Sequence, residues 1–480
     1  MGPAVELRHN NEERLKTSST GVTITGEVAA SQDFPSIRPT LDFNFAAVKK
    51  LDPRITYTRS GPASYVDENG YLKLVSANVP RFDHDPTTRE CKGFLLEESR
   101  TNLMKSVIDP HLPKSTYSSN SNGAIVEVSD DVLAPDGSAH TLKLHWTNYT
   151  ATHNGYIRVG NTSTEIGTLS AATYSFSFFV KRGTDGKHNM EEFLAGTQSG
   201  IGAAQYHFTS QDFSPSYAVN VTLCNNSNVT IDKYPDGWYR LSGTVTASQS
   251  FTPDNTGASY YVLGNSTFKT FFEAMPFYHW GFQLEVGGFP TSYIGGTVSA
   301  TTTRGWEVPI ITGTDLTDVF NPTEGTMFYE ASVSSLTNDN QPIVAFRDLG
   351  STTDNYHAMG YRIGGGSSGN IRTWFKSNNA NTYLSNHGST GMVAGSPYKH
   401  MYGYKLNDAS DAYNTGAASA QTTSSSVTPM LTSGVVDELR FGGYYSGPET
   451  TTYSLEAGHI KRFSYWKTKL SNTQIKTYVS

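Results

Sequence analysis

The chain has 480 residues, too many for one hydrophobic core of ordinary size, so we expect two or three domains. Only 16% of the residues are charged and the formal net charge is −7, which gives no basic surface for nucleic acid and no polybasic membrane anchor. Aromatic residues make up 12% and glycine totals 44, whereas long helical periodicities are missing, so strands joined by tight turns are favoured. No apolar run approaches the length of a membrane span.

Residues 1–30 alternate apolar and polar side chains around Val22, Ile24 and Val28. This strand-rich segment has too little apolar mass to fold alone. It resembles the stem segments of phage tail fibres, and the resemblance implies a homotrimer, because short strands from three chains together bury apolar surface that one chain leaves exposed.

Residues 31–110 contain prolines every ten to twenty positions, which predicts an extended, loop-rich shoulder without long helices. The phrases LDFNFA, ASYVDENGYL and GFLLEESRTNL in this segment resemble the N-terminal part of phage structural proteins. The resemblance implies that GFLLEESRTNL leads directly into a jelly-roll domain.

That jelly roll is predicted at residues 111–297, where period-two strands are separated by Gly, Asn and Asp clusters. In TYSFSFFVKRG, the alternation places Tyr174, Phe176, Phe178 and Val180 on one buried side and leaves the other side to solvent. In the closing strand, we expect three side chains to share one side: Trp280, Phe282 and Leu284. The ending at 280–294 resembles the last strand of carbohydrate-binding-module-like domains in phage tail proteins.

Residues 298–480 are predicted to form a second antiparallel sandwich, and the order of its short strands resembles the concanavalin-like, laminin-G-type lectin fold. At its end, Ser471 and Gln474 predict a capping box for a short helix, and Leu470 with Ile475 predicts a hydrophobic staple. The expected fold class is therefore all-β: a short stem followed by two antiparallel β-sandwiches.

No catalytic pattern stands out in the sequence. The neighbouring carboxylates Glu97 and Glu98 should point to opposite faces of a strand and solvate its edge, so they do not form the carboxylate pair of a glycosidase. We therefore predict no enzymatic activity and no cofactor. Metal sites were weighed at two places. Residues 83–85 lie inside the turn FDHDPTT, which the family resemblance accounts for, and at 407–414 the strict alternation of a calcium loop is missing, so we predict no metal at either place.

Exposed aromatic side chains are the best candidates for glycan contacts in a β-sandwich. Tyr444 and Tyr445 follow two glycines and precede Ser-Gly-Pro, which predicts a loop tip. Trp374 alternates with core positions and is the third candidate. The alternative, which we weigh as the stronger, is that these rings pack in the core or between protomers.

The family resemblance implies a structural protein of a tailed bacteriophage, made in the bacterial cytoplasm and located in the virion. We expect a tail fibre or spike component that attaches to host surface glycans, with its N-terminus bound to other virion proteins. A capsid or tail decoration protein with purely structural lectin-like domains is the alternative, and a polysaccharide depolymerase is the third possibility.

Overall fold

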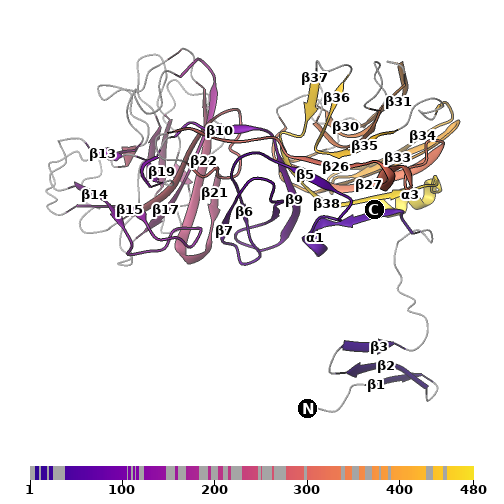
Figure 1. The fold of residues 1–480 in the computed structure, drawn as a ribbon, viewed down its shortest axis with the longest axis horizontal. Helices are drawn as coiled ribbons and strands as arrows, with labels where there is room; N and C mark the ends of the chain where they lie inside the picture. The colour runs from indigo at the N-terminus through magenta and orange to yellow at the C-terminus, as the bar shows by residue number, and fades with distance from the viewer. Residues whose placement is uncertain are drawn as a thin grey trace. The chain divides into compact units, whose positions relative to one another are not determined.

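The computed structural model divides the chain into two compact units, Met1–Arg38 and Pro39–Ser480 (Figure 1). It describes residues 6–9, 12–18, 21–24, 38–104, 106–109, 112–113, 115–117, 124–146, 157–159, 169–182, 193–195, 204–208, 215–217, 230–246, 250, 262–263, 277–296, 300–336, 341–348, 356–362, 370–377, 380–387, 391–428, 436–446 and 451–480. No helix among these residues is long and apolar enough to cross a membrane.

The first unit is a three-stranded antiparallel sheet of β1 (Glu6–His9), β2 (Glu12–Ser18) and β3 (Gly21–Ile24). Val22 and Ile24 lie on β3, whereas Val28 lies outside the described residues. The sequence predicted strands here, and they are present. The predicted homotrimer stays a prediction.

The middle of the chain contributes two six-stranded antiparallel sheets. One has the order β14 (Ala124–Ser129), β15 (Thr141–Trp146), β24 (Phe277–Val286), β17 (Thr173–Arg182), β22 (Trp238–Thr246) and β21 (Thr230–Lys233). The other has the order β13 (Ser115–Tyr117), β16 (Ile157–Val159), β23 (Val262–Leu263), β18 (Phe193–Ala195), β19 (Ala204–Phe208) and β20 (Pro215–Tyr217). A short pair precedes them, β11 (Ser106–Asp109) with β12 (Leu112–Pro113).

A β-bulge at Gly281 corrects the predicted face of β24. Ser177 opposes Gln283 and Phe179 opposes Trp280, so β24 carries one extra residue there, and Gly281 adopts a left-handed φ of 62°. The extra residue turns Trp280 to the side of Phe179, with 5.6 Å between the ring centroids, while Phe282 stacks on Phe178. Trp280 and Phe282 therefore do not share one side.

Strand β17 is buried on both sides, which corrects the expectation that one side faces solvent. Phe176 and Phe178 are buried as predicted, but Ser175 and Ser177 are also fully buried. Arg240 donates a hydrogen bond to the Ser177 hydroxyl at 2.9 Å, and Phe179 on the same side packs against Trp280, so polar and aromatic side chains together cover the second face. A small hydroxyl with a hydrogen-bond partner tolerates such burial.

The C-terminal part contains two larger antiparallel sheets. The seven-stranded sheet has the order β31 (Ala380–His387), β30 (Asn370–Ser377), β29 (Tyr356–Arg362), β28 (Gln341–Arg347), β35 (Glu438–Phe441), β26 (Val308–Thr312) and β5 (Thr56–Thr58). The eight-stranded sheet has the order β34 (Ser419–Ser424), β33 (Asp408–Asn414), β32 (Tyr398–Lys405), β27 (Glu324–Val333), β38 (Ala457–Trp466), β9 (Cys91–Glu97) and β8 (Phe82–His84), with β4 (Leu41–Asn44) also paired to β38. The predicted all-β class of antiparallel sandwiches is confirmed.

Strands from the predicted shoulder complete both of these sheets. β9 pairs with β38 and lies beside it in Figure 1, and β5 pairs with β26. The same segment carries the helix α1 (Phe45–Val48) and the hairpin of β6 (Ala63–Val66) and β7 (Leu72–Val75). The C-terminal sandwich thus draws on residues on both sides of the jelly roll, and the domain boundaries at 31, 111 and 298 stay predictions.

The chain leaves this sandwich and returns to it at one place. β10 (Arg100–Asn102) pairs antiparallel with β25 (Thr302–Arg304), although about two hundred residues separate them. Gly61 lies against this point, where an added Cβ would fall 2.0 Å from the Thr303 carbonyl oxygen, so the close approach requires glycine. The jelly roll is therefore an insertion whose two ends are paired.

The remaining helices are short: α2 (Thr314–Thr317), the 3₁₀ turn η1 (Pro235–Gly237) and α3 (Asn472–Val479). α3 begins with the predicted capping box, since Ser471 accepts from the Gln474 amide and Gln474 accepts from the Ser471 amide. Leu470 and Ile475 are both buried in one apolar cluster, so the predicted hydrophobic staple is confirmed as well.

Residues 407–414, weighed as a calcium loop, form strand β33 and its preceding turn. Asp411 is fully buried and accepts hydrogen bonds from His400 at 2.8 Å and His387 at 3.0 Å. Burial alone would raise the pKa of Asp411, but the two imidazoles hold it well below its usual range. Asp411 therefore is a hydrogen-bonded residue of the core of the sandwich.

We expect Asp411→Asn to lower the free energy of unfolding by about 3 kcal/mol at pH 7, because the amide keeps one acceptor oxygen for the two imidazoles but loses the negative charge beside them and buries an NH2 group where Oδ2 has no partner among the described residues. Urea denaturation at pH 7 measures the loss. The control is Asp408→Asn on the same strand, whose half-exposed ion pair with Lys469 at 3.0 Å should contribute less than about 1 kcal/mol. Equal losses in the two variants would contradict the role given to Asp411.

Candidate functional site

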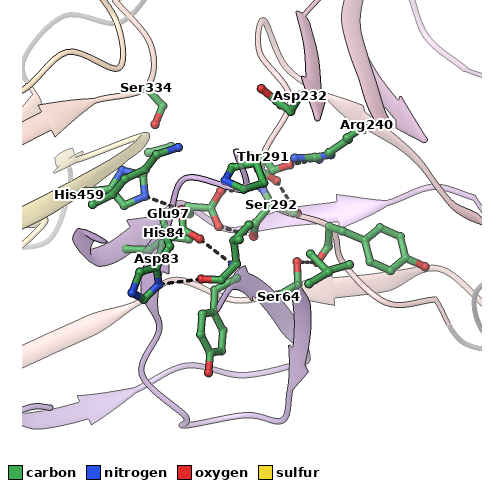
Figure 2. Close-up of a pocket in the computed structure, with 18 of the residues that line it drawn as sticks. Ser64, Asp83, His84, Glu97, Asp232, Arg240, Thr291, Ser292, Ser334 and His459 are labelled. Atoms are coloured by element: carbon green, nitrogen blue, oxygen red, sulfur yellow. Dashed lines mark hydrogen bonds and ion pairs between the residues drawn. The ribbon is translucent and has the colours of Figure 1, made fainter. Parts of the chain in front are cut away.

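A cavity of about 160 Å³ is lined by strands from both sandwiches and by the hairpin β6–β7 (Figure 2). The lining is rich in carboxylates, hydroxyls and basic side chains. We call it the junction cavity, and its lining residues are Ser64, Tyr65, Val66, Leu72, Asp83, His84, Pro86, Lys92, Leu95, Glu97, Asp232, Tyr234, Arg240, Pro290, Thr291, Ser292, Tyr293, Ser334, Ala457 and His459.

A buried ion cluster adjoins the cavity, centred on Glu307. Its carboxylate lies 3.2 Å from the guanidinium of Arg59 and 2.6 Å from that of Arg81, and none of these side chains is exposed. Tyr57 donates a hydrogen bond to the same carboxylate at 2.5 Å, and the Glu97 amide donates another at 2.8 Å. Because charges in such a place need matched partners, this cluster fixes the surrounding strands.

Glu97 continues the cluster to the wall of the cavity. Its carboxylate lies 2.8 Å from Arg81 and 3.1 Å from Arg304, and it accepts hydrogen bonds from the amide and hydroxyl of Ser292. Burial would raise the pKa of Glu97, but the two arginines hold it well below its usual range. The expectation that Glu97 solvates a strand edge is therefore wrong.

The motif at 280–294 supplies the polar groups around this cluster. Glu285 accepts hydrogen bonds from the Thr291 amide at 3.0 Å and the Thr291 hydroxyl at 2.5 Å. Gln283 accepts from the Ile294 amide at 2.6 Å and donates to Glu285 at 2.9 Å. These hydrogen bonds hold residues 290–293 in the wall of the junction cavity, so the main role of the motif is structural.

Asp83 and His459 form a hydrogen-bonded pair in the wall, with 2.8 Å between Nε2 of His459 and the carboxylate. Asp83 also accepts from the Val66 amide at 2.7 Å. Burial would raise the pKa of Asp83, but the hydrogen bond and charge of His459 hold it below its usual value. Asp85 instead caps the following turn at Thr87 and Thr88, and the described residues include no cluster suited to a metal ion.

Two cavity side chains have polar atoms without partners among the described residues. The His84 imidazole is 3% exposed and donates from Nδ1 to the Val66 carbonyl at 3.0 Å, which leaves Nε2 buried and unpaired. Arg240 donates from Nη2 to the Thr291 carbonyl at 2.6 Å, while its Nε is buried and unpaired.

Asp232 faces Arg240 across the pair of strands β21 and β22. Burial raises the pKa of its carboxyl above the usual value, and the charge of Arg240 opposes that shift. Figure 2 shows Asp232 and Arg240 on one side of the cavity and His459 and Ser334 on the other (Figure 2). The cavity therefore offers acceptors and donors on opposing walls.

The aromatic residues predicted from sequence lie away from this cavity. Trp374 shares a sheet face with Arg372, whose guanidinium lies 5.2 Å from the ring centroid, but only 2% of Trp374 is exposed. Tyr444 and Tyr445 lie on β36 (Gly443–Ser446), which pairs with β37 (Thr451–Ser454), so a strand stands where a loop tip was expected. Their side chains lie outside the described residues.

Sequence reasoning noticed Asp83 and His84 but assigned them to a turn, and it did not single out Asp232 or Arg240. Asp232 and Arg240 are eight positions apart on either side of the turn signal YPDG, which predicts a hairpin that brings them together. The contact between Asp83 and His459 had no such signal, because 376 positions separate them.

Chemically, the cavity is suited to a polar ligand. Carboxylates accept hydrogen bonds, and guanidinium and imidazole groups donate them in fixed directions. Glu97 and Asp83 are already held by protein partners, so neither is left free to attack a bound molecule. The arrangement favours binding through hydrogen bonds.

No family model matches the sequence, and no curated protein matches it. Among solved structures, the chain is similar to the LG1-3 region of the laminin alpha2 chain, at 11% identity and a TM-score of 0.25, covering 64% of this chain and 65% of that one. It is also similar to the CBM22-1-CBM22-2 tandem of Paenibacillus barcinonensis Xyn10C, at 9% identity and a TM-score of 0.24, covering 78% and 99%. A third is the Bacteroides ovatus xyloglucan PUL GH43B, at 10% identity and a TM-score of 0.22, covering 88% and 99%.

The chain thus spans just under two thirds of the laminin fragment that it matches. The all-β assignment rests on the strand pairing of the chain itself.

The neighbours Glu97 and Glu98 should respond oppositely to pH. A depressed pKa stabilises the fold above the unfolded value of about 4.3, and this contribution is lost as the pH falls toward the folded pKa. We expect Glu97→Gln to cost about 3 kcal/mol at pH 7 and about 1 kcal/mol less at pH 3.5. Urea unfolding of variant and wild type at both pH values measures the difference.

Glu98→Gln is the matched control. Burial raises the pKa of Glu98 while Arg100 opposes the shift, so an ionised Glu98 disfavours the fold as the pH rises. This variant should gain stability relative to the wild type between pH 3.5 and pH 7. The same pH trend in both variants would contradict the assignment of Glu97 to the ion cluster.

Proposed function

We propose that this chain is a non-enzymatic component of a tailed-phage virion, of the tail-fibre or spike type, that attaches to glycans of the host surface. The sequence resemblance supports the virion role, and the two antiparallel sandwiches provide a rigid scaffold for a binding site. The observation that carries glycan binding is the junction cavity, whose walls present carboxylate, hydroxyl, guanidinium and imidazole side chains. Sugars are recognised by such convergent polar groups.

The expected assembly is a homotrimer joined to other virion proteins through the N-terminal sheet. β1, β2 and β3 are short, and a small three-stranded sheet gains stability from association. A trimer also presents three binding sites, which raises the avidity of weak contacts. Tyr444 and Tyr445 stay a second predicted contact with glycan.

Two other functions remain candidates. A decoration protein would use the same sandwiches only to pack against neighbours in the virion. A depolymerase is favoured by one observation, since burial raises the pKa of Asp232 while the pKa of Asp83 lies below its usual value, and such opposed carboxyls serve acid and base roles. Against it, His459 and the Val66 amide occupy both oxygens of Asp83.

We expect the purified chain to retain bacterial surface polysaccharide on a sensor chip and to release no reducing ends from it. Binding and a colorimetric reducing-end assay on the same polysaccharide panel measure the two properties. Reducing ends released by the wild type and lost in Asp232→Asn would replace the binding role by hydrolysis. A panel of host envelope polysaccharides without any retention would favour the decoration protein.

Light scattering should give a mass three times the 52.4 kDa of the chain, because three copies of the N-terminal sheet are expected to associate. The measurement at micromolar concentration needs no variant. A mass of one chain at that concentration would contradict the trimer, while leaving the binding site of each copy untouched.

A further inference from the structure

We propose that the edge strand β34 pairs antiparallel with β34 of a second copy of this chain, around a twofold axis at Gln421. The pairing joins the eight-stranded sheets of the two copies into one continuous sheet. It depends neither on glycan binding by the junction cavity nor on association of the N-terminal sheet.

β34 is the last strand of the eight-stranded sheet, at the end of the C-terminal sandwich that lies away from the jelly roll (Figure 1). β33 pairs with one side of β34, and no strand among the residues that the structure describes pairs with the other side. Four of its six residues are exposed: Ser419, Ala420, Thr422 and Thr423. At the opposite end of the sheet, β8 packs against β6 of the hairpin. One edge of the sheet is therefore covered and the other is open.

The hairpin that joins β33 to β34 determines which backbone groups of β34 point outward. The Thr415 amide donates to the Ala418 carbonyl at 2.9 Å, so these two residues form a hydrogen-bonded pair. Such pairs alternate along an antiparallel ladder, and the register of β33 and β34 continues from there without a shift. The amide and carbonyl groups of Ser419, Gln421 and Thr423 therefore point away from β33.

These outward groups match a second copy of the same strand. In antiparallel pairing around Gln421, each Gln421 stands opposite its counterpart, and each Ser419 stands opposite the other copy's Thr423. Every one of these pairs is a hydrogen-bonded pair with two backbone hydrogen bonds, so each outward group of the strand has a partner. A shifted register leaves at least one outward residue of β34 unpaired. Twofold pairing thus gives a closed contact in which both copies use the same surface.

The composition of the edge favours a second copy as the partner. The sequence contains no charged residue between Asp411 and Asp437. Edges that stay unpaired in proteins are commonly protected by charged residues, proline or a bulge, and β34 contains none of these. Two copies of the strand therefore meet without like-charge repulsion, and serine opposite threonine is a favourable pair across strands. An uncharged edge has nothing to select an acidic or basic peptide instead.

The small contact area implies a weak affinity. A stable protein interface buries roughly 1,200 Å² or more in total, and one pair of six-residue strands is a smaller contact. We therefore expect the copies to associate at about 100 µM and to remain apart at about 1 µM. The mass expected at micromolar concentration from the N-terminal sheet is thus unaffected.

Sedimentation equilibrium of the full chain between about 1 µM and about 300 µM tests the pairing, and the average mass of the wild type should rise over this range. Thr423→Pro removes an outward amide that makes no bond to β33, so it should weaken association at least tenfold with an unchanged melting temperature. Thr423→Ala keeps that amide. It is the matched control and should associate as the wild type does.

Cysteine cross-linking locates the axis and does not require Thr423→Pro to fold. Gln421→Cys places the two introduced thiols opposite each other, with about 5.5 Å between the Cα atoms, which suits a disulfide. Mild oxidation should then join the chains in pairs on a denaturing gel. Ser419→Cys is the control, because residue 419 stands opposite Thr423 and not opposite itself. The wild type shows what its own Cys91 and Cys224 contribute.

The results decide as follows. Association that Thr423→Pro weakens and Thr423→Ala does not, with cross-linked pairs from Gln421→Cys alone, supports the twofold pairing. A constant mass of the wild type over the whole concentration range overturns it, as does equal association of Thr423→Pro and wild type. Cross-linking by Ser419→Cys but not by Gln421→Cys overturns the axis at Gln421. Protection of residues 419–423 from hydrogen exchange at every concentration, with a constant mass, would show that another segment covers the edge, and this also overturns the proposal.

Discussion

The pairing of buried charges where the jelly roll joins the C-terminal sandwich is the constraint on which the rest of this structure depends. Three carboxylates, Glu97, Glu285 and Glu307, lie beside three guanidinium groups, Arg59, Arg81 and Arg304, and all six residues are buried. The balance is essential, because one unmatched charge in such a place costs several kcal/mol. Glu285 lies on strand β24 of the jelly roll, and the other five come from chain segments before and after it, so the cluster forms only when both ends of the insertion are in place.

The cluster also explains why the motifs at 93–103 and 280–294 contain charged and polar residues within strands. Two residues of the first motif, Glu97 and Arg100, form hydrogen bonds with the backbone of the second motif. Within the second motif, Gln283 and Glu285 accept hydrogen bonds from backbone amides. Arg100, for example, donates to the Val286 carbonyl and lies 4.8 Å from the Phe289 ring centroid. Polar residues that pair with partners far away in the sequence specify the architecture, and they do not by themselves identify a ligand.

Local patterns in the sequence predicted what depends on neighbours along the chain. The alternation in β17 gave the correct inner face for Phe176 and Phe178, and the capping box at Ser471 was visible from two residue types at the right spacing. The bulge at Gly281 was not predictable by alternation, because one extra residue reverses the face of Trp280. The burial of Glu97 was missed for another reason: its partner Arg304 lies 207 positions away.

The junction cavity follows from the same constraint that makes the fold. Thr291 and Ser292 are bound to Glu285 and Glu97, and the carbonyl of Thr291 in turn orients Arg240 toward the cavity. Binding groups thus stand on a preorganised wall, which lowers the entropy lost when a weak ligand binds. Asp232 differs from the other acidic residues of the wall, because it stands opposite Arg240 on paired strands without a hydrogen bond to any described residue. Burial raises the pKa of this carboxyl, and the charges of Arg240 and Lys92 oppose that shift, so the fold gains little from its ionisation.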